Sequence, residues 1–114
     1  MSQKIVLASG SAIRAEMMRR AKVDFYVVTA KVDEETIKSA LLAEGTRPRD
    51  IADALAESKA RKVSAKVPES LVIGCDQILS WEDGIMSKPA SKYDALFQLK
   101  SLCGTRHTLL SAAV

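Results

Sequence analysis

Hydrophobic residues along the chain follow two alternating patterns, one typical of buried strands and the other of helices with one apolar face. Short apolar runs predict strands at residues 4–8, 25–28, 71–76, 78–81, 85–87 and 107–114. Apolar residues at helical spacing predict helices at residues 12–22, 33–42, 48–66 and 91–102. Strands that alternate with helices in this way indicate an α/β domain.

Turn and capping residues mark the boundaries of these elements. Pro48 suits the first turn of a long helix, and Asp83-Gly84 is a two-residue hairpin signal. Ser91 resembles the start of a capping box. The helix at 12–22 is expected to carry Ile13, Met17, Met18 and Ala21 on its apolar face, and the helix at 91–102 to carry Leu96, Leu99 and Leu102.

The last predicted strand, at residues 107–114, has no closing signal after it. A sheet that stopped there would expose an unpaired edge, with which a partner or a second copy could pair as a homodimer. We therefore expect residues 1–114 to be a truncated or unusually short chain.

Composition narrows the function classes. Of the 114 residues, 47% are hydrophobic and 27% charged, as in ordinary globular domains. The net charge of +3 favours an anionic ligand, whereas 4% aromatics and the lack of a Lys/Arg block argue against a nucleic acid polymer. No apolar run is long enough to span a membrane and no signal peptide is visible, which predicts a cytoplasmic protein. Cys75 and Cys103 match no disulfide or zinc pattern and are expected to be buried.

Polar residues interrupt the apolar pattern first at Ser9-Gly10-Ser11, between a strand and a helix. Unpaired N–H groups at a helix start favour an anion, and Arg14 on the first turn could hold a phosphate bidentately. The simpler interpretation is that Ser11 only caps the helix while Arg14 faces solvent. Spacing alone favours the simpler interpretation.

Lys59 is the second interruption, because it shares a four-residue row with apolar Ile51, Leu55 and Val63. A lysine in such a row either extends to the rim, as is more common, or points into a cleft where an anion meets it. Cations after the hairpin, at Lys88-Pro89, and before the last strand, at Arg106-His107, could also lie near a phosphate. Each of them is also compatible with an ordinary surface position.

Asp76 is the third, at the predicted end of the most apolar strand. Ligand sites of open α/β folds lie beyond the carboxyl ends of strands, and small Gly74 and Cys75 would let a ligand approach. A carboxylate there can bind magnesium or orient a water. A strand-end Asp bonded to backbone N–H groups is an equally good interpretation of the position.

Six segments in register resemble the Maf family of nucleotide pyrophosphatases. They are Leu7-Ala8-Ser9-Gly10-Ser11-Ala12-Ile13-Arg14, Val32-Asp33-Glu34, Leu55-Ala56-Glu57-Ser58-Lys59-Ala60, Val72-Ile73-Gly74-Cys75-Asp76, Asp83-Gly84 with Lys88-Pro89, and Leu102-Cys103-Gly104 with His107. Ala12 stands where the family motif has proline. The resemblance implies a mixed sheet flanked by helices, as in Maf and related inosine triphosphatases, with residues 1–114 forming the N-terminal part and the second lobe absent.

The resemblance also implies an activity, the hydrolysis of nucleoside triphosphates to the monophosphate and pyrophosphate with a divalent metal, usually magnesium. Asp76 would accept a proton from water or hold the metal, and Glu34 would share in binding metal or water. Lys59 would act with them, and the triphosphate would be held by Lys59 and by Ser9, Ser11, Arg14 and Lys88. Because the second lobe is absent, little or no turnover is expected from this chain alone.

Substrate choice depends on Ile13 and Gln77. Gln after the motif Asp resembles the branch that acts on 7-methyl-GTP, although that branch tends to carry an aromatic residue at the position of Ile13. The alternatives are a dTTP/UTP pyrophosphatase, a pyrophosphatase for purines such as ITP, and a non-catalytic protein that acts in septum formation through a partner.

Overall fold

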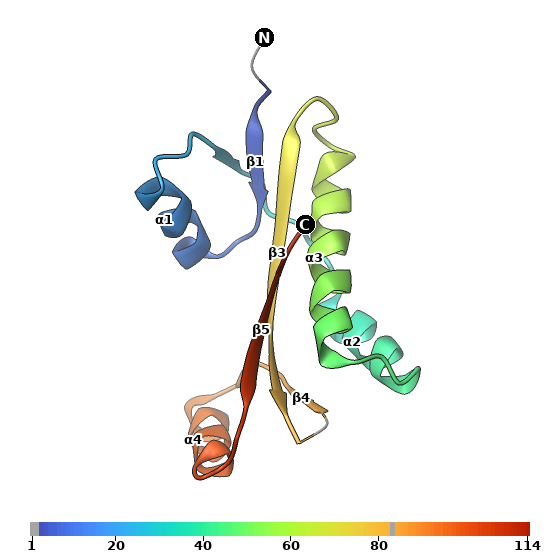
Figure 1. The fold of residues 1–114 in the computed structure, drawn as a ribbon, viewed down its shortest axis with the longest axis vertical. Helices are drawn as coiled ribbons and strands as arrows, with labels where there is room; N and C mark the ends of the chain where they lie inside the picture. The colour runs from blue at the N-terminus through green and yellow to red at the C-terminus, as the bar shows by residue number, and fades with distance from the viewer. Residues whose placement is uncertain (1–2, 83) are drawn as a thin grey trace.

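A computed structural model describes residues 3–82 and 84–114, so that Asp83 of the predicted hairpin turn lies outside the described residues. The structure confirms an α/β domain with a mixed five-stranded sheet and flanking helices (Figure 1). Its elements are β1 (Ile5–Ala8), α1 (Ala12–Arg20), β2 (Tyr26–Val27), α2 (Glu34–Ala43), α3 (Pro48–Ser64), β3 (Leu71–Trp81), β4 (Gly84–Met86), α4 (Lys92–Leu102) and β5 (Thr108–Ala113).

Strand β3 is one continuous strand of 11 residues, and the prediction that it ends at Asp76 is wrong. Its first half, from Leu71 to Gly74, pairs in parallel with β1, which in turn pairs with β2. Its second half pairs antiparallel with β5 on one side and with β4 at its far end. The polar residues at the centre of β3 therefore mark a change of partner, from a parallel to an antiparallel neighbour.

The two edges of β3 differ around this change of partner. Gly74 exchanges both backbone hydrogen bonds with Val114, so even-numbered residues of β3 direct their backbone groups toward β5. Odd-numbered residues direct theirs toward the opposite edge, where β1 is paired as far as Gly74 and β4 only from Leu79. Within the described residues, β3 thus has a short opening between β1 and β4.

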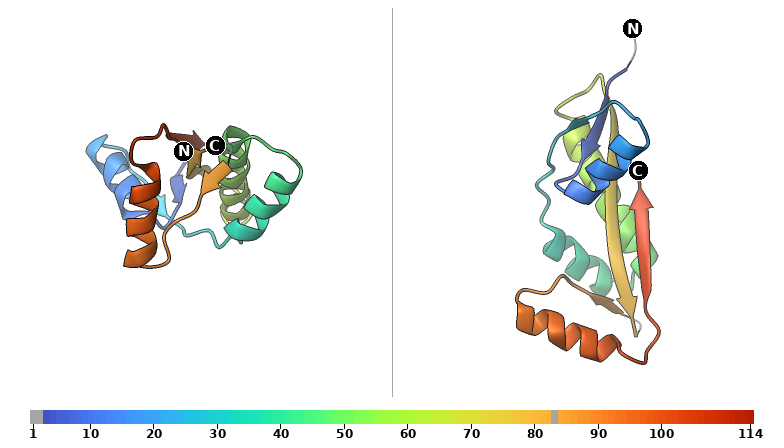
Figure 2. Two further views of the ribbon diagram at one scale, coloured as in Figure 1. Left: turned by 90° about the horizontal axis from the view of Figure 1, so that it is seen from below. Right: turned by 90° about the vertical axis from the view of Figure 1, so that its left-hand side faces the viewer.

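Helix α3 covers one face of the sheet and supplies half of the buried hydrophobic residues in the described part of the chain. Its buried residues Ile51 and Leu55 belong to a cluster with Ile78 of β3 and Ala112 of β5. Gly74 allows the close approach, since a Cβ atom there would lie 2.3 Å from the carbonyl oxygen of Ala56. Helices α2 and α3 lie on one side of the sheet, and α1 and α4 on the other (Figure 2).

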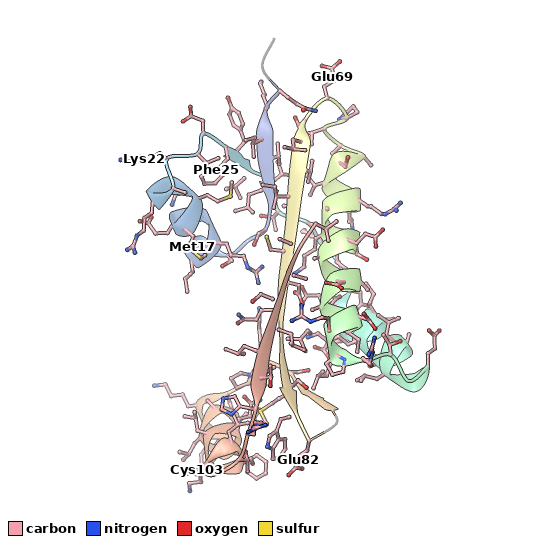
Figure 3. All side chains as sticks on the ribbon, in the orientation of Figure 1. Met17, Lys22, Phe25, Glu69, Glu82 and Cys103 are labelled. Carbon is pink, nitrogen blue, oxygen red and sulfur yellow. The ribbon has the colours of Figure 1, made fainter. Side chains whose placement is uncertain are left out.

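The face of the sheet toward α1 and α4 is much less covered. Ile13 and Met17 of α1 are 75% and 64% exposed, and Leu96 and Leu99 of α4 are 50% and 66% exposed. Met17 lies on α1, away from α3 (Figure 3). The apolar faces predicted for these helices are mostly exposed, with only Met18 and Leu102 half-buried, and α1 and α4 lie apart from each other along the sheet (Figure 1). Cys103 is likewise exposed, contrary to the prediction, while Cys75 is half-buried.

None of the helices in residues 3–82 and 84–114 combines the length and the apolar character needed to cross a membrane.

Candidate functional site

Lys59 lies between two carboxylates from different elements. Its Nζ atom is 2.9 Å from Oδ1 of Asp76 on β3 and 2.6 Å from Oε1 of Glu34 at the start of α2. The side chains of Lys59 and Asp76 are only 12% and 8% exposed, and that of Glu34 is 30% exposed. Lys59 therefore points into a cleft and does not extend to the rim, and Asp76 pairs with a side chain.

The local structure explains how these three groups meet. The row of α3 that contains Leu55 and Val63 packs on the sheet, so Lys59 is carried onto the same face. Asp76 is an even-numbered residue of β3, and its side chain faces α3 like that of buried Ile78. Asp33 caps α2 by accepting a hydrogen bond from the backbone N–H of Thr36, which fixes the helix start that carries Glu34.

Lys59 and its two carboxylate partners, Glu34 and Asp76, form a bridge of ion pairs in which each charge stabilises the others. Burial alone would raise the pKa of Glu34, but the hydrogen bond and positive charge of Lys59 outweigh it and lower that pKa below its ordinary value. Burial likewise acts to lower the pKa of Lys59, but hydrogen bonds and charges of Glu34 and Asp76 raise it overall. Glu34 and Lys59 are therefore both charged at neutral pH.

Asp76 retains one oxygen that can serve a ligand. Its Oδ2 atom is buried and has no hydrogen-bond partner among the described residues. An unpaired buried carboxylate oxygen is costly, and an ion or a water is the usual remedy. No group of three or more His, Cys, Asp or Glu side chains in the described residues could form a complete metal cage. Asp76 with Glu34 nevertheless fits magnesium, which binds through one or two carboxylates and completes its shell with water and phosphate oxygens.

The loop after β1 meets β3 at its opening. Ser11 caps α1 by accepting a hydrogen bond from the N–H of Arg14 (3.3 Å), as the simpler interpretation predicted. Arg14 does not face solvent, because its Nη1 atom donates to the carbonyl oxygen of Cys75 (3.1 Å) and to Oγ of buried Ser9 (3.4 Å). Arg14 thus provides a hydrogen bond to the backbone of β3 just beyond the point where its pairing with β1 ends. This contact holds the guanidinium of Arg14 at the cleft.

A cavity of about 610 Å³ joins these parts, a size that suits a nucleotide-sized ligand. It is lined by eight of the nine predicted site residues, namely Ser9, Ser11, Arg14, Glu34, Lys59, Asp76, Gln77 and Lys88. The ninth, Ile13, is an exposed residue of α1 and does not line the cavity. Arg106 and His107, which precede β5, do not line it either.

The cavity also has lining residues that the sequence analysis missed. They include Lys38, Ser87 and Gln98. Lys38 follows Glu34 by one helical turn, a spacing that could have indicated it. Gln98 donates a hydrogen bond to the carbonyl oxygen of Ser87 (2.7 Å) and so joins α4 to the segment after β4. No sequence pattern predicts this contact. Gln77, on the exposed side of β3, donates to Oγ of Ser111 (3.0 Å).

The site thus combines a lysine-bridged pair of acids with a serine-rich helix start on an α/β sheet. The Maf-like protein family matches residues 4–114, and the chain belongs to this family. It is 61% identical over all 114 residues to a nucleoside triphosphate pyrophosphatase of Ruegeria sp. (strain TM1040). It is 55% identical to a protein of the same name from Ruegeria pomeroyi, and 46% identical to a 7-methyl-GTP pyrophosphatase of Mesorhizobium japonicum. In each case the chain spans 57% of the relative's length.

Proposed function

We propose that the protein acts as a nucleoside triphosphate pyrophosphatase, which releases a nucleoside monophosphate and pyrophosphate. The observation that carries this proposal is the bridge of Lys59 to Glu34 and Asp76, next to the unpaired Oδ2 atom of Asp76 in a cavity lined by cations. The two Ruegeria relatives bear the name of this activity.

In the proposed reaction, a water attacks the α-phosphorus and its proton passes to Asp76. The bond between the α-phosphorus and the oxygen that links it to the β-phosphorus breaks, and pyrophosphate leaves with the electron pair. Lys59 holds Asp76 by one carboxylate oxygen, which leaves Oδ2 as the acceptor. Glu34 would bind a magnesium ion, which supplies positive charge against the phosphate oxygens; in the alternative role of Asp76, its Oδ2 atom would bind that ion in place of the proton.

The triphosphate would be held by Ser9, Ser11, Arg14 and Lys88, together with Lys59. Ser11 already accepts a backbone hydrogen bond as a cap, and its hydroxyl proton remains available to a phosphate oxygen. Arg14 has five N–H donors, of which the Nη1 group is used internally. These donors would neutralise charge as it moves onto the leaving pyrophosphate.

7-methyl-GTP is the proposed substrate. Gln77 lines the cavity, and the relative from Mesorhizobium japonicum is named for this substrate. A Gln side chain offers both a donor and an acceptor to a base edge, but in this chain its Nε2 group donates to Ser111. The position of Ile13 outside the cavity lining gives no stacking contact to the methylated base, so dTTP or UTP is the alternative to test.

The test is pyrophosphate release from a panel of 7-methyl-GTP, GTP, dTTP, UTP and ITP, with magnesium and with protein in excess so that slow turnover is visible. Asp76→Asn should reduce release by about 100-fold or more, since it removes the proton acceptor. The matched control is Asp53→Asn, on the exposed side of α3, which should leave release unchanged. Equal release by Asp76→Asn and the unchanged protein would contradict the proposal.

A second candidate function is partner binding, as in a non-catalytic role in septum formation. Its support is β5, a six-residue strand that pairs with β3 along one edge and has no strand paired to its other edge among the described residues. A partner, or a second copy forming a homodimer, would add a strand there. Asp76→Asn separates the two functions, because partner binding should survive it.

A cytoplasmic location stays a prediction.

A further inference from the structure

Lys38 is a second enclosed lysine of the cavity, and the reaction proposed above does not use it. Its side chain is 12% exposed, the same fraction as that of Lys59. Its ion-pair partner within the described residues is Glu35, at 3.6 Å, and the Glu35 side chain is 71% exposed. That distance is too long for a good hydrogen bond, and an exposed pair three residues apart contributes little. Lys38 is thus largely enclosed, and its ion pair among the described residues is with an exposed carboxylate.

An ammonium group in such a place is unfavourable unless an anionic ligand meets it. Lys38 lies one helical turn after Glu34 on α2, so the two side chains project from the same face, and both line the cavity. Its positive charge also contributes to the lowered pKa of Glu34, after the larger effects of burial and of Lys59. The side chain therefore acts electrostatically on the site already described.

The charge balance of the cavity indicates the kind of ligand that suits it. Its lining carries four cations, Arg14, Lys38, Lys59 and Lys88, against the two anions Glu34 and Asp76, which leaves a charge of 4 − 2 = +2. Lys59 is committed to both carboxylates, and Arg14 donates to Ser9 and Cys75. Lys38 and Lys88 are the cations of this lining that remain for an external anion.

We propose that Lys38 is a substrate-binding residue that contacts an anionic oxygen of the polyphosphate chain. This inference rests on the proposed function and extends it by a residue on α2. Lys38 would provide a phosphate contact from α2, in addition to those from the loop after β1. The enclosed charge of Lys38 would lower the stability of the folded protein without a bound anion and raise it when an anion is bound.

Binding of sodium tripolyphosphate in the presence of magnesium chloride, measured by titration calorimetry, tests the proposal without requiring turnover. Lys38→Met should weaken binding by about tenfold or more, because a charged hydrogen bond is lost. Lys38→Arg should restore most of the affinity, since it keeps the charge. Lys100→Met, on the exposed side of α4, is the matched control and should bind as the unchanged protein does.

Thermal melting without ligand separates a binding role from a structural one. Lys38→Met should melt at the same temperature as the unchanged protein or higher, because it removes an enclosed charge that lacks a strong partner. A clear fall in melting temperature, or unchanged tripolyphosphate affinity in Lys38→Met, would overturn the role of Lys38 and leave the proposed function standing. If the unchanged protein does not bind tripolyphosphate, both proposals fail.

Discussion

Replacing Lys59 by methionine tests the part of the site on which the other interpretations depend. The change keeps most of the apolar stem and removes the ammonium that lies 2.6 Å from Glu34 and 2.9 Å from Asp76. Two carboxylates are then left near each other without the cation that joined them, and one of them is only 8% exposed. We expect a loss of stability, because the remaining charges are both poorly solvated and mutually repulsive.

The magnitude follows from the burial of the three side chains. Breaking a fully buried ion pair costs about 3–5 kcal/mol, whereas an exposed pair contributes about 0–1 kcal/mol. Glu34 is 30% exposed, which places the bridge between these limits. We therefore expect Lys59→Met to lower the free energy of unfolding by about 2–4 kcal/mol, and the melting temperature by roughly 10 °C.

The pH dependence has a definite sign. The pKa of Glu34 is lowered below 4.5 in the folded protein, so its contribution is present above pH 4.5 and is lost as the pH falls through the folded pKa. The pKa of Lys59 is raised above 10.5, so its contribution is present below pH 10.5 and is lost as the pH rises through the folded pKa. The stability difference between the two proteins should be constant near neutral pH and shrink in acid, where Glu34 is protonated.

Urea unfolding at several pH values measures this difference, with Lys100→Met as a surface control. The reasoning is refuted if Lys59→Met unfolds within about 0.5 kcal/mol of the unchanged protein at neutral pH, the range expected of an ordinary surface substitution. It is also refuted if the difference persists undiminished in acid.

Two further predictions concern the loop after β1 and the contact between α3 and β3. Ser11→Ala and Ser91→Ala each remove a helix cap, so each should lower the free energy of unfolding by about 1 kcal/mol. Only Ser11→Ala should weaken tripolyphosphate binding, and equal affinity of the two variants would show that Ser11 is a cap alone. Gly74→Ala places a Cβ atom 2.3 Å from the carbonyl oxygen of Ala56 and 2.7 Å from the backbone nitrogen of Ala60, so α3 must move away from β3. We expect urea unfolding to show about 3 kcal/mol of destabilisation, together with weaker tripolyphosphate binding. A loss of stability below about 1 kcal/mol would contradict the close packing.

Much of the fold could be predicted because local signals decide it. The row of Ile51, Leu55 and Val63 predicted a helix packed on the sheet, and the chain forms α3 there. The length of β3 could not be predicted, since Asp76 and Gln77 interrupt an apolar run as strand ends do. What continues the strand is its pairing with β5, more than 30 residues later, and such pairing leaves no local trace.

The site shows the same division. Lys59 and Asp76 were conspicuous because each places a charge in an otherwise apolar row or run, whereas the role of Glu34 was implied by the family resemblance alone. Lys38 was missed because a lysine on a helix with a weak apolar face is usually solvated, and its enclosure depends on tertiary packing. The exposure of Ile13 and Met17 was missed for a related reason, since a pattern shows which face of a helix is apolar but does not show whether another element covers it.

The pairing order of β3 has a consequence for how the site forms during folding. Lys59 and Asp76 are 17 residues apart, and α3 with β3 can bring them together after closing a short loop. Ala8 and Gly74, by contrast, are 66 residues apart, so β1 docks only after a much larger loop is closed. We expect the charged pair to assemble early and the loop that contains Ser9 to join it late. Nascent chains would therefore hold the half of the site that contains Lys59 and Asp76 before they gain the half that contains Ser9.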